Sequence, residues 1–124
     1  MRVRNIKIGI KGLRAVLDEA KETMTRIAEG KAVQKVHDLN FASYEAMRRI
    51  LTPRRLELLH AIKEKHPRSV YELAQLLRRD LKNVNEDLAI FTNLGLVELR
   101  GTPTGRKNVV PLVTVDKIQV EITV

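Results

Sequence analysis

The 124-residue chain contains no cysteine, which excludes disulfide bonds and thiolate metal sites and makes the cytoplasm the expected compartment. Its three histidines, His37, His60 and His66, show no ligand spacing, so we predict no metal site. No apolar run approaches the ~18 residues of a membrane span, and the N-terminal MRVRNIKIGIKG is too polar for a signal peptide. We therefore expect a cytoplasmic protein with no membrane partner.

Aromatic residues are also scarce, since the chain has only Phe41, Tyr44, Tyr71 and Phe91. Hydrophobic residues still make up 44% of the chain, so we expect an ordered core built mainly from Leu, Ile and Val. The length suits one compact domain with a small extension. With so few aromatic side chains available for base stacking, sequence-specific recognition of single-stranded RNA is not expected.

Basic residues outnumber acidic ones, 23 to 15, which gives a formal net charge of +8 and a pI near 10.1. Such a charge favours a polyanionic partner, with nucleic acid first and an anionic membrane surface second. On charge alone, a generally basic protein without such a partner remains an alternative.

The sequence contains no recognisable catalytic set. It has no phosphate-binding glycine loop, no nucleophile elbow, and no paired carboxylates beside a histidine. Ser43 and Ser69 each precede a helical pattern and are typical of helix N-caps rather than nucleophiles. We therefore expect neither enzymatic activity nor a cofactor.

Hydrophobic periodicity divides the chain into an N-terminal strand–helix–strand extension, residues 1–41, and a domain of residues 42–124. Residues 6–10, IKIGI, alternate as a short strand, and residues 33–41 alternate imperfectly as a second one. Between them a helix is predicted to end near Gly30. Its apolar stripe could pack on its own domain or on a second copy, and with the terminal strands it is our candidate dimer interface. The stripe consists of Leu13, Val16, Leu17, Ala20, Met24 and Ile27.

The order of elements in residues 52–113 is helix, short helix, turn, helix, strand, basic loop and strand. Thr52 and Ser69 are the expected N-caps of the first two helices, with Pro53 at the first helical position, and a third helix capped by Asp80 is expected to end at Gly95. The final KIQVEITV alternates strictly and is expected to pair with the IKIGI strand. The predicted fold class is α+β, mainly α: a winged helix-turn-helix with an N-terminal strand–helix extension and terminal β-strands.

The third helix, residues 80–94, is the candidate reading helix for the major groove. Its residues Val84, Leu88, Phe91 and Leu94 share one face and are predicted to be buried. Lys82, Asn83, Asn85 and Glu86 are then predicted to face outward, where Asn can contact adenine and Lys can contact guanine or phosphate. The alternative is that the asparagines only cap and solvate the helix start and that Glu86 is an ordinary surface charge. Asp87 is expected to border the packed interface and pair with a basic side chain.

Phosphate contacts are expected on three segments around that helix. Arg78 and Arg79 lie in the turn before it, and Arg100, Arg106 and Lys107 lie on the wing, residues 97–113. For each of these residues, a solvated charge without a ligand is the alternative. Further candidates for contact with the nucleic-acid backbone are Arg54, Arg55, Ser69 and Tyr71.

Three segments together resemble a family of small archaeal and bacterial predicted transcriptional regulators, the MarR-like winged helix-turn-helix proteins. They are FASYEAMRRILTPRRLELLHAI, SVYELAQLLRRDLKNVNEDLAIFTNLGLVEL and VVPLVTVDKIQVEI, and the resemblance runs from about Phe41 to Ile122. It implies DNA binding, usually by a homodimer, and some members are antitoxin-like. It supports a motif around the third helix. Asn85 and Glu86 depart from that motif, so the resemblance does not indicate the operator sequence. The motif residues are Arg79, Asp80, Lys82, Asn83, Val84 and Asp87.

The sequence therefore predicts a sequence-specific, double-stranded DNA-binding transcriptional regulator that acts as a homodimer. One alternative is an antitoxin-type protein-interaction module that neutralises a partner toxin and autoregulates its operon. A second alternative is an RNA-binding winged helix.

Overall fold

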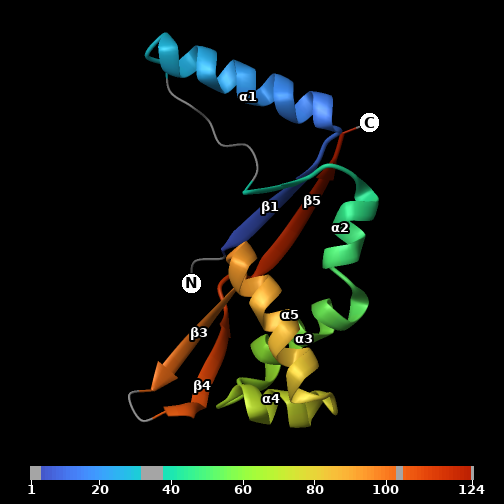
Figure 1. The fold of residues 1–124 in the computed structure, drawn as a ribbon, viewed down its shortest axis with the longest axis vertical. Coiled ribbons are helices and arrows are strands. Elements are labelled where there is room, and N and C mark those ends of the chain that lie inside the picture. Colours follow the sequence, from blue (N-terminus) through green and yellow to red (C-terminus); the bar gives the residue numbers. More distant parts are fainter. Residues whose placement is uncertain (1–3, 32–37, 103–104, 124) are drawn as a thin grey trace. The chain divides into compact units, whose positions relative to one another are not determined.

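The computed structural model describes residues 4–31, 38–102 and 105–123, apart from the side chains of Leu13, Thr102 and residues 105–108. These residues form an α+β fold with five helices and two small sheets (Figure 1). The elements in chain order are β1 (Asn5–Ile10), α1 (Leu13–Ala28), β2 (Leu39–Phe41), α2 (Tyr44–Ile50), α3 (Pro53–Lys65), α4 (Val70–Leu77), α5 (Leu81–Leu94), β3 (Val97–Thr102), β4 (Gly105–Val113) and β5 (Lys117–Ile122).

The backbone divides into two compact units, and the division differs from the expected boundary after residue 41. The first unit combines Met1–Arg49 with Lys117–Val124, and the second is Ile50–Asp116. The last strand belongs to the first unit because β5 pairs with β1 along its whole length. Strand pairing across a long stretch of sequence therefore decides the division, which a linear reading of composition does not reveal.

The first unit is built on a parallel sheet of order β2-β1-β5, with β1 in the middle. Ile6, Ile8 and Ile10 of β1 are buried, as their alternation predicted. The expected pairing of the C-terminal strand with the N-terminal strand is confirmed, within one chain and in parallel. The second predicted strand is shorter than expected, with only residues 39–41 in β2, while residues 32–37 lie outside the described part.

Helix α1 follows β1 after Gly12 and ends at Ala28, close to the predicted stop. Glu29 is its C-cap, and Gly30 adopts φ +72°, a left-handed conformation that glycine tolerates without steric cost. Nζ of Lys11 lies 2.6 Å from a carboxylate oxygen of Glu19, which connects the first turns of α1 to the end of β1. None of the described α1 side chains is fully buried.

In the second unit, side-chain hydroxyls cap α3 and α4 as predicted. Thr52 Oγ1 accepts from the N–H of Arg55 at 3.2 Å, and Ser69 Oγ accepts from the N–H of Glu72 at 3.0 Å. The predicted cap by Asp80 is wrong in one respect. Asp80 occupies the N-cap position of α5 in an extended conformation, but its side chain makes no cap hydrogen bond.

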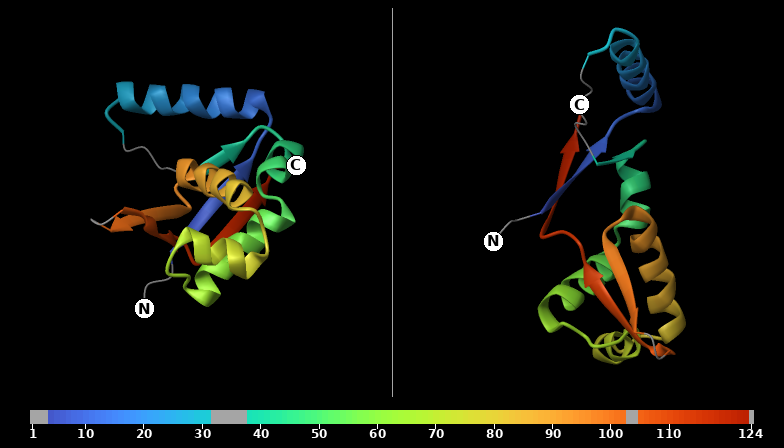
Figure 2. Two further views of the ribbon diagram at one scale, coloured as in Figure 1. Left: turned by 60° about the horizontal axis from the view of Figure 1, so that its bottom comes forward. Right: turned by 90° about the vertical axis from the view of Figure 1, so that its left-hand side faces the viewer.

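The core of the second unit lies between its helices and the antiparallel hairpin of β3 and β4. Figure 2 shows α5 running alongside β3, and the two elements are in contact. Phe91 of α5 and Leu96 just after it are fully buried, whereas Leu94, predicted to be buried, is only half-buried. Pro111 is buried in β4 opposite Leu99, in a two-stranded sheet in which each strand is an edge strand, a position that proline tolerates.

Gly95 ends α5 at φ +79°, and a Cβ built there meets no atom within 4 Å. Gly95→Ala should therefore lower the free energy of unfolding by about 1 kcal/mol through backbone strain alone. Gly95→Asn should cost less, because asparagine adopts the left-handed region more readily than alanine. Urea denaturation of the three proteins measures both effects, and a neutral alanine variant would contradict the assigned conformation.

Candidate nucleic-acid interface

One face of α5 is packed and the opposite face is open, as the sequence predicted. The buried residues are Val84, Asp87, Leu88 and Phe91. The exposed residues include all four candidates for base contact, Lys82, Asn83, Asn85 and Glu86. The packing thus leaves the amide and ammonium groups at the start of the helix available to a ligand.

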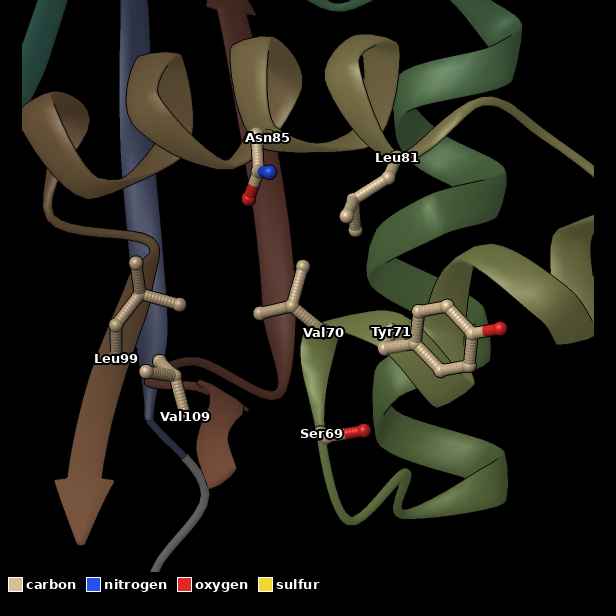
Figure 3. Close-up of a pocket in the computed structure, with 7 residues that line it drawn as sticks. All are labelled: Ser69, Val70, Tyr71, Leu81, Asn85, Leu99 and Val109. Atoms are coloured by element: carbon tan, nitrogen blue, oxygen red, sulfur yellow. The ribbon is translucent and has the colours of Figure 1, made fainter. Parts of the chain in front are cut away.

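The side chains of Asn83 and Asn85 leave α5 in different directions. Residues two positions apart on an α-helix are separated by roughly 160° around its axis, so Asn83 and Asn85 occupy opposite flanks of the exposed face. Asn85 lines an open groove beside α5, as Figure 3 shows, while Asn83 is not among the groove's lining residues. Of the two amides, only that of Asn85 therefore lies at this groove.

The groove is an open pocket of about 720 Å³ between the start of α4, the first turns of α5 and the hairpin. In Figure 3 the side chains of Leu81 and Asn85 project from α5 toward it, and Leu99 and Val109 approach from the hairpin. Its full lining is Ser69, Val70, Tyr71, Leu81, Asn85, Leu99 and Val109. The walls are therefore mainly apolar, with a hydroxyl, a phenol and an amide among them.

Sequence reasoning identified Ser69, Tyr71 and Asn85 but missed the apolar part of the groove. The missed residues are Val70, Leu81, Leu99 and Val109. Leu81 lies three residues before Val84 and seven before Leu88, so in the sequence it extends the apolar stripe of α5, yet in the structure it is 43% exposed. Val70 likewise reads as an ordinary core residue of α4, and it is indeed buried.

Asp87 is buried, with 6% of its surface exposed, and holds two arginines that the sequence had assigned to phosphate contacts. Its Oδ1 accepts from Nε of Arg55 at 3.0 Å, and its Oδ2 lies 2.8 Å from Nη2 of Arg79. Arg55 also donates from Nη1 to the carbonyl of Ile50 at 2.9 Å. The expected pairing of Asp87 with a basic side chain is confirmed, and Asp87 pairs with two such side chains rather than one. Arg55 and Arg79 therefore join α3, the α4–α5 turn and α5, and we assign them a structural role.

Arg78, next to Arg79 in sequence, points its side chain into solvent. It is the C-cap of α4 in the left-handed conformation, with φ +53°. This conformation lets the N–H of Arg79 donate to the carbonyl of Ala74 at 3.0 Å, which closes the turn into α5. Arg78 is thus an exposed cation two residues from Asp80, the N-cap of α5.

The remaining cationic candidates fall into two groups. Arg54 and Arg100 are exposed, and Nε of Arg100 lies 3.4 Å from a carboxylate oxygen of Glu98, a surface pair that contributes little to stability. The side chains of Arg106 and Lys107 lie outside the described residues, although their backbone belongs to β4.

The apolar stripe of α1 remains uncovered in the described structure. Met24 is 72% exposed and Ile27 62%, while Leu17 and Ala20 are exposed and Val16 is half-buried. Leu13 belongs to the helix, but its side chain is outside the described residues. The alternative in which the stripe packs on its own domain is therefore not observed for these side chains, and the face is left open to another molecule.

Among the described residues, no group of three or more His, Asp or Glu side chains could hold a metal ion. No helix in the same part of the chain is both long enough and apolar enough to cross a membrane.

The two adjacent arginines should behave differently when neutralised. Arg79→Gln should lower the free energy of unfolding by about 1–3 kcal/mol, because it removes one partner of a buried carboxylate. Arg78→Gln, the matched control, should change it by less than about 0.5 kcal/mol. Chemical denaturation measures both, and equal effects would contradict the structural role of Arg79.

Comparison with known proteins identifies a family for this chain. No curated protein matches the chain. The HVO_A0114 family model matches residues 50–120, which include α3 and the three elements that border the groove, α4, α5 and the hairpin, whereas α1 lies outside the match. Since the match spans more than half of the sequence, the chain belongs to the HVO_A0114 family.

Proposed function

We propose that the chain is a double-stranded DNA-binding transcriptional regulator. In this proposal residues 50–116 act as a winged helix-turn-helix, with α5 in the major groove and the β3–β4 hairpin as the wing. The observation that carries the proposal is the convergence of three elements on one open groove. These are the start of α4, the exposed face of α5 with Asn85, and the hairpin.

The dimensions and packing of α5 support this role. A helix with its side chains is about 10–12 Å across, and the major groove of B-form DNA is about 12 Å wide. The buried face of α5 is fixed by its core residues and by the pairing of Asp87, so the exposed face is presented rigidly. A rigid support is what base recognition requires, because hydrogen bonds to base edges depend on position.

The chemistry of the groove suits the edge of a base pair and its sugar. The amide of Asn85 can make two hydrogen bonds to adenine. The exposed Leu81, on the same flank of α5, offers an apolar contact to the thymine methyl group. The groove's apolar walls therefore complement an A·T pair next to deoxyribose, with no charged group among the lining residues.

Phosphate neutralisation in this proposal rests on basic residues of the segments around that groove. Arg78 and Lys82 lie at the start of α5, and Arg100, Arg106 and Lys107 belong to the hairpin. The backbone N–H groups at the start of α4 add a favourable dipole for an anion. The net charge of +8 provides long-range attraction to the duplex. The resemblance to MarR-like regulators, which usually bind DNA as homodimers, points in the same direction.

Asn85→Ala should weaken binding to a preferred duplex by about 1–3 kcal/mol and relax sequence preference at one position. The preferred duplex comes from selecting bound fragments of genomic DNA at controlled salt, and affinities follow from fluorescence anisotropy. Asn83→Ala is the matched control, with the same side chain on the opposite flank, and should change affinity by less than about 0.5 kcal/mol.

Two comparisons in the same assay sharpen the interpretation. Arg78→Gln should weaken preferred and scrambled duplexes alike and reduce the slope of log K against log salt by about 1. A structured RNA of equal length should compete poorly. The proposal fails if neither Asn85→Ala nor Arg78→Gln changes DNA binding, or if the RNA binds more tightly than the duplex.

A second candidate function is an antitoxin-type interaction module, and the uncovered stripe of α1 favours it. Exposed contiguous apolar side chains on a helix mark a surface that another protein can bury. Deleting residues 1–30 is an unsuitable test, because it would remove β1 from the middle of the sheet. Substitutions on the exposed face of α1 avoid this problem.

The double variant Leu17→Ser/Met24→Ser should lose co-purification with the product of a neighbouring gene while the chain stays folded, since both side chains are exposed. Glu22→Ser, an exposed polar position on the same helix, is the control and should retain the complex. Retention of the complex by the Leu17/Met24 double variant would contradict α1 as the binding surface.

A further inference from the structure

Strand β5 leaves one long edge of the first unit's sheet open. β1 occupies one side of β5, and within the described residues no strand pairs with its other side. The opposite edge of the sheet is β2, which is only three residues long. A six-residue edge strand without proline presents a row of backbone donors and acceptors that another strand can pair with.

The direction of the backbone groups shows which residues face this edge. The N–H of Lys117 donates to the carbonyl of Arg4 at 3.4 Å, and that of Thr123 donates to the carbonyl of Ile10 at 3.3 Å, so both point toward β1. Because backbone groups alternate along a strand, odd-numbered residues of β5 face β1 and even-numbered residues face outward. The N–H and C=O groups of Ile118, Val120 and Ile122 therefore point to the open edge.

The side chains of the same residues are also incompletely covered. Val120 is 44% exposed and Ile122 is 53% exposed, although their register partners in β1, Ile8 and Ile10, are buried. Residues paired in register point to the same face of a sheet. The apolar row of the sheet is thus covered on its central strand and open on its edge strand.

We propose that β5 of a second copy of the chain pairs antiparallel with this edge, about a two-fold axis at Gln119. Ile118 would then form a hydrogen-bonded pair with Val120 of the second copy, in agreement with the outward direction of both residues' backbone groups. The two three-stranded sheets would join into one sheet of six strands. Such an interface is isologous, so the same patch serves both subunits.

The charge pattern of β5 favours antiparallel pairing with β5 of a second copy in this register. Lys117, Gln119 and Glu121 share one face, with a cation at one end, an amide in the middle and an anion at the other end. Reversing the strand places Lys117 opposite Glu121 of the second copy at both ends, and Gln119 opposite itself. A shift of two residues would place Lys117 opposite Thr123, and a parallel pairing would place like charges together.

These cross-strand pairs lie at non-hydrogen-bonded positions, where the Cα atoms approach to about 4.5 Å and side chains interact most closely. Opposite charges there stabilise the pairing and like charges destabilise it. The proposal depends on neither DNA binding nor the role of α5, so its test uses the protein without DNA. A failure here is therefore distinguishable from a failure of the proposed function.

Sedimentation equilibrium of the full chain without DNA should show a dimer. Lys117→Glu and Glu121→Lys should each raise the dimer dissociation constant about tenfold or more, because each creates two like-charge pairs. An equimolar mixture of the two variants should dimerise again, since every Glu of one chain then lies opposite a Lys of the other. The double variant K117E/E121K should also dimerise by itself.

Lys21→Glu on α1 is the charge-matched control and should leave the dimer unchanged, as should Leu17→Ser. A monomeric wild-type chain overturns the proposal, as do single β5 variants that dimerise like the wild type, or a mixture that dimerises no better than its components. Loss of the dimer in Leu17→Ser also overturns it and assigns the interface to α1. Should a single β5 substitution unfold the chain, the double variant decides: a dimer supports the proposal and a monomer contradicts it.

Discussion

The carboxylate of Asp87 is the constraint on which the proposed interface depends. It is buried on α5 and meets the guanidinium groups of Arg55, from α3, and Arg79, from the turn before α5. A buried carboxylate without partners would cost several kcal/mol, so the native arrangement requires all three segments to come together. The orientation of α5 about its own axis follows from this, and with it the direction in which Asn85 points.

The pairing of Asp87 also determines which basic side chains near α5 keep an accessible positive charge. Two of the arginines nearest to the helix are engaged in the structure and contribute little accessible charge. The cationic character of the exposed side therefore rests on Arg78 and Lys82, supplemented by the hairpin. In the proposed complex, few phosphate contacts lie close to α5, so base contacts make up a larger share of the contacts made there.

Features with a local physical cause could be predicted from the sequence. The hydroxyl caps of Thr52 and Ser69, the buried stripe of α5 and the end at Gly95 each depend on residues within one or two turns. The association of KIQVEITV with IKIGI was predictable too, because strict alternation is typical of a strand that has one buried face. Its parallel direction within the chain, and the resulting division into units, depend on tertiary arrangement.

The distinction between adjacent arginines was not predictable. Arg78 and Arg79 have the same chemistry and neighbouring positions, and only the left-handed backbone at Arg78 turns one outward and the other toward Asp87. The apolar part of the groove was missed for a different reason. A search for polar contacts passes over residues such as Leu81 and Leu99, whose roles depend on three elements meeting in space.

The three exposed surfaces belong to different parts of the chain. The groove at α5 lies in the second unit and within the family match, residues 50–120, while the edge of β5 and the stripe of α1 belong to the first unit. In this account, DNA contact, self-association and a further protein contact are separate properties. Each can be altered without changing the residues that carry the others.

The most direct test of the central claim is a titration of the isotope-labelled chain with duplex DNA, followed by backbone amide chemical shifts. We expect the largest shifts at the start of α4, the first turns of α5 and the β3–β4 hairpin, with little change along α1. Shifts confined to α1 or to β5, or no shifts with any duplex at low salt, would contradict the assignment of the groove as the DNA-binding surface.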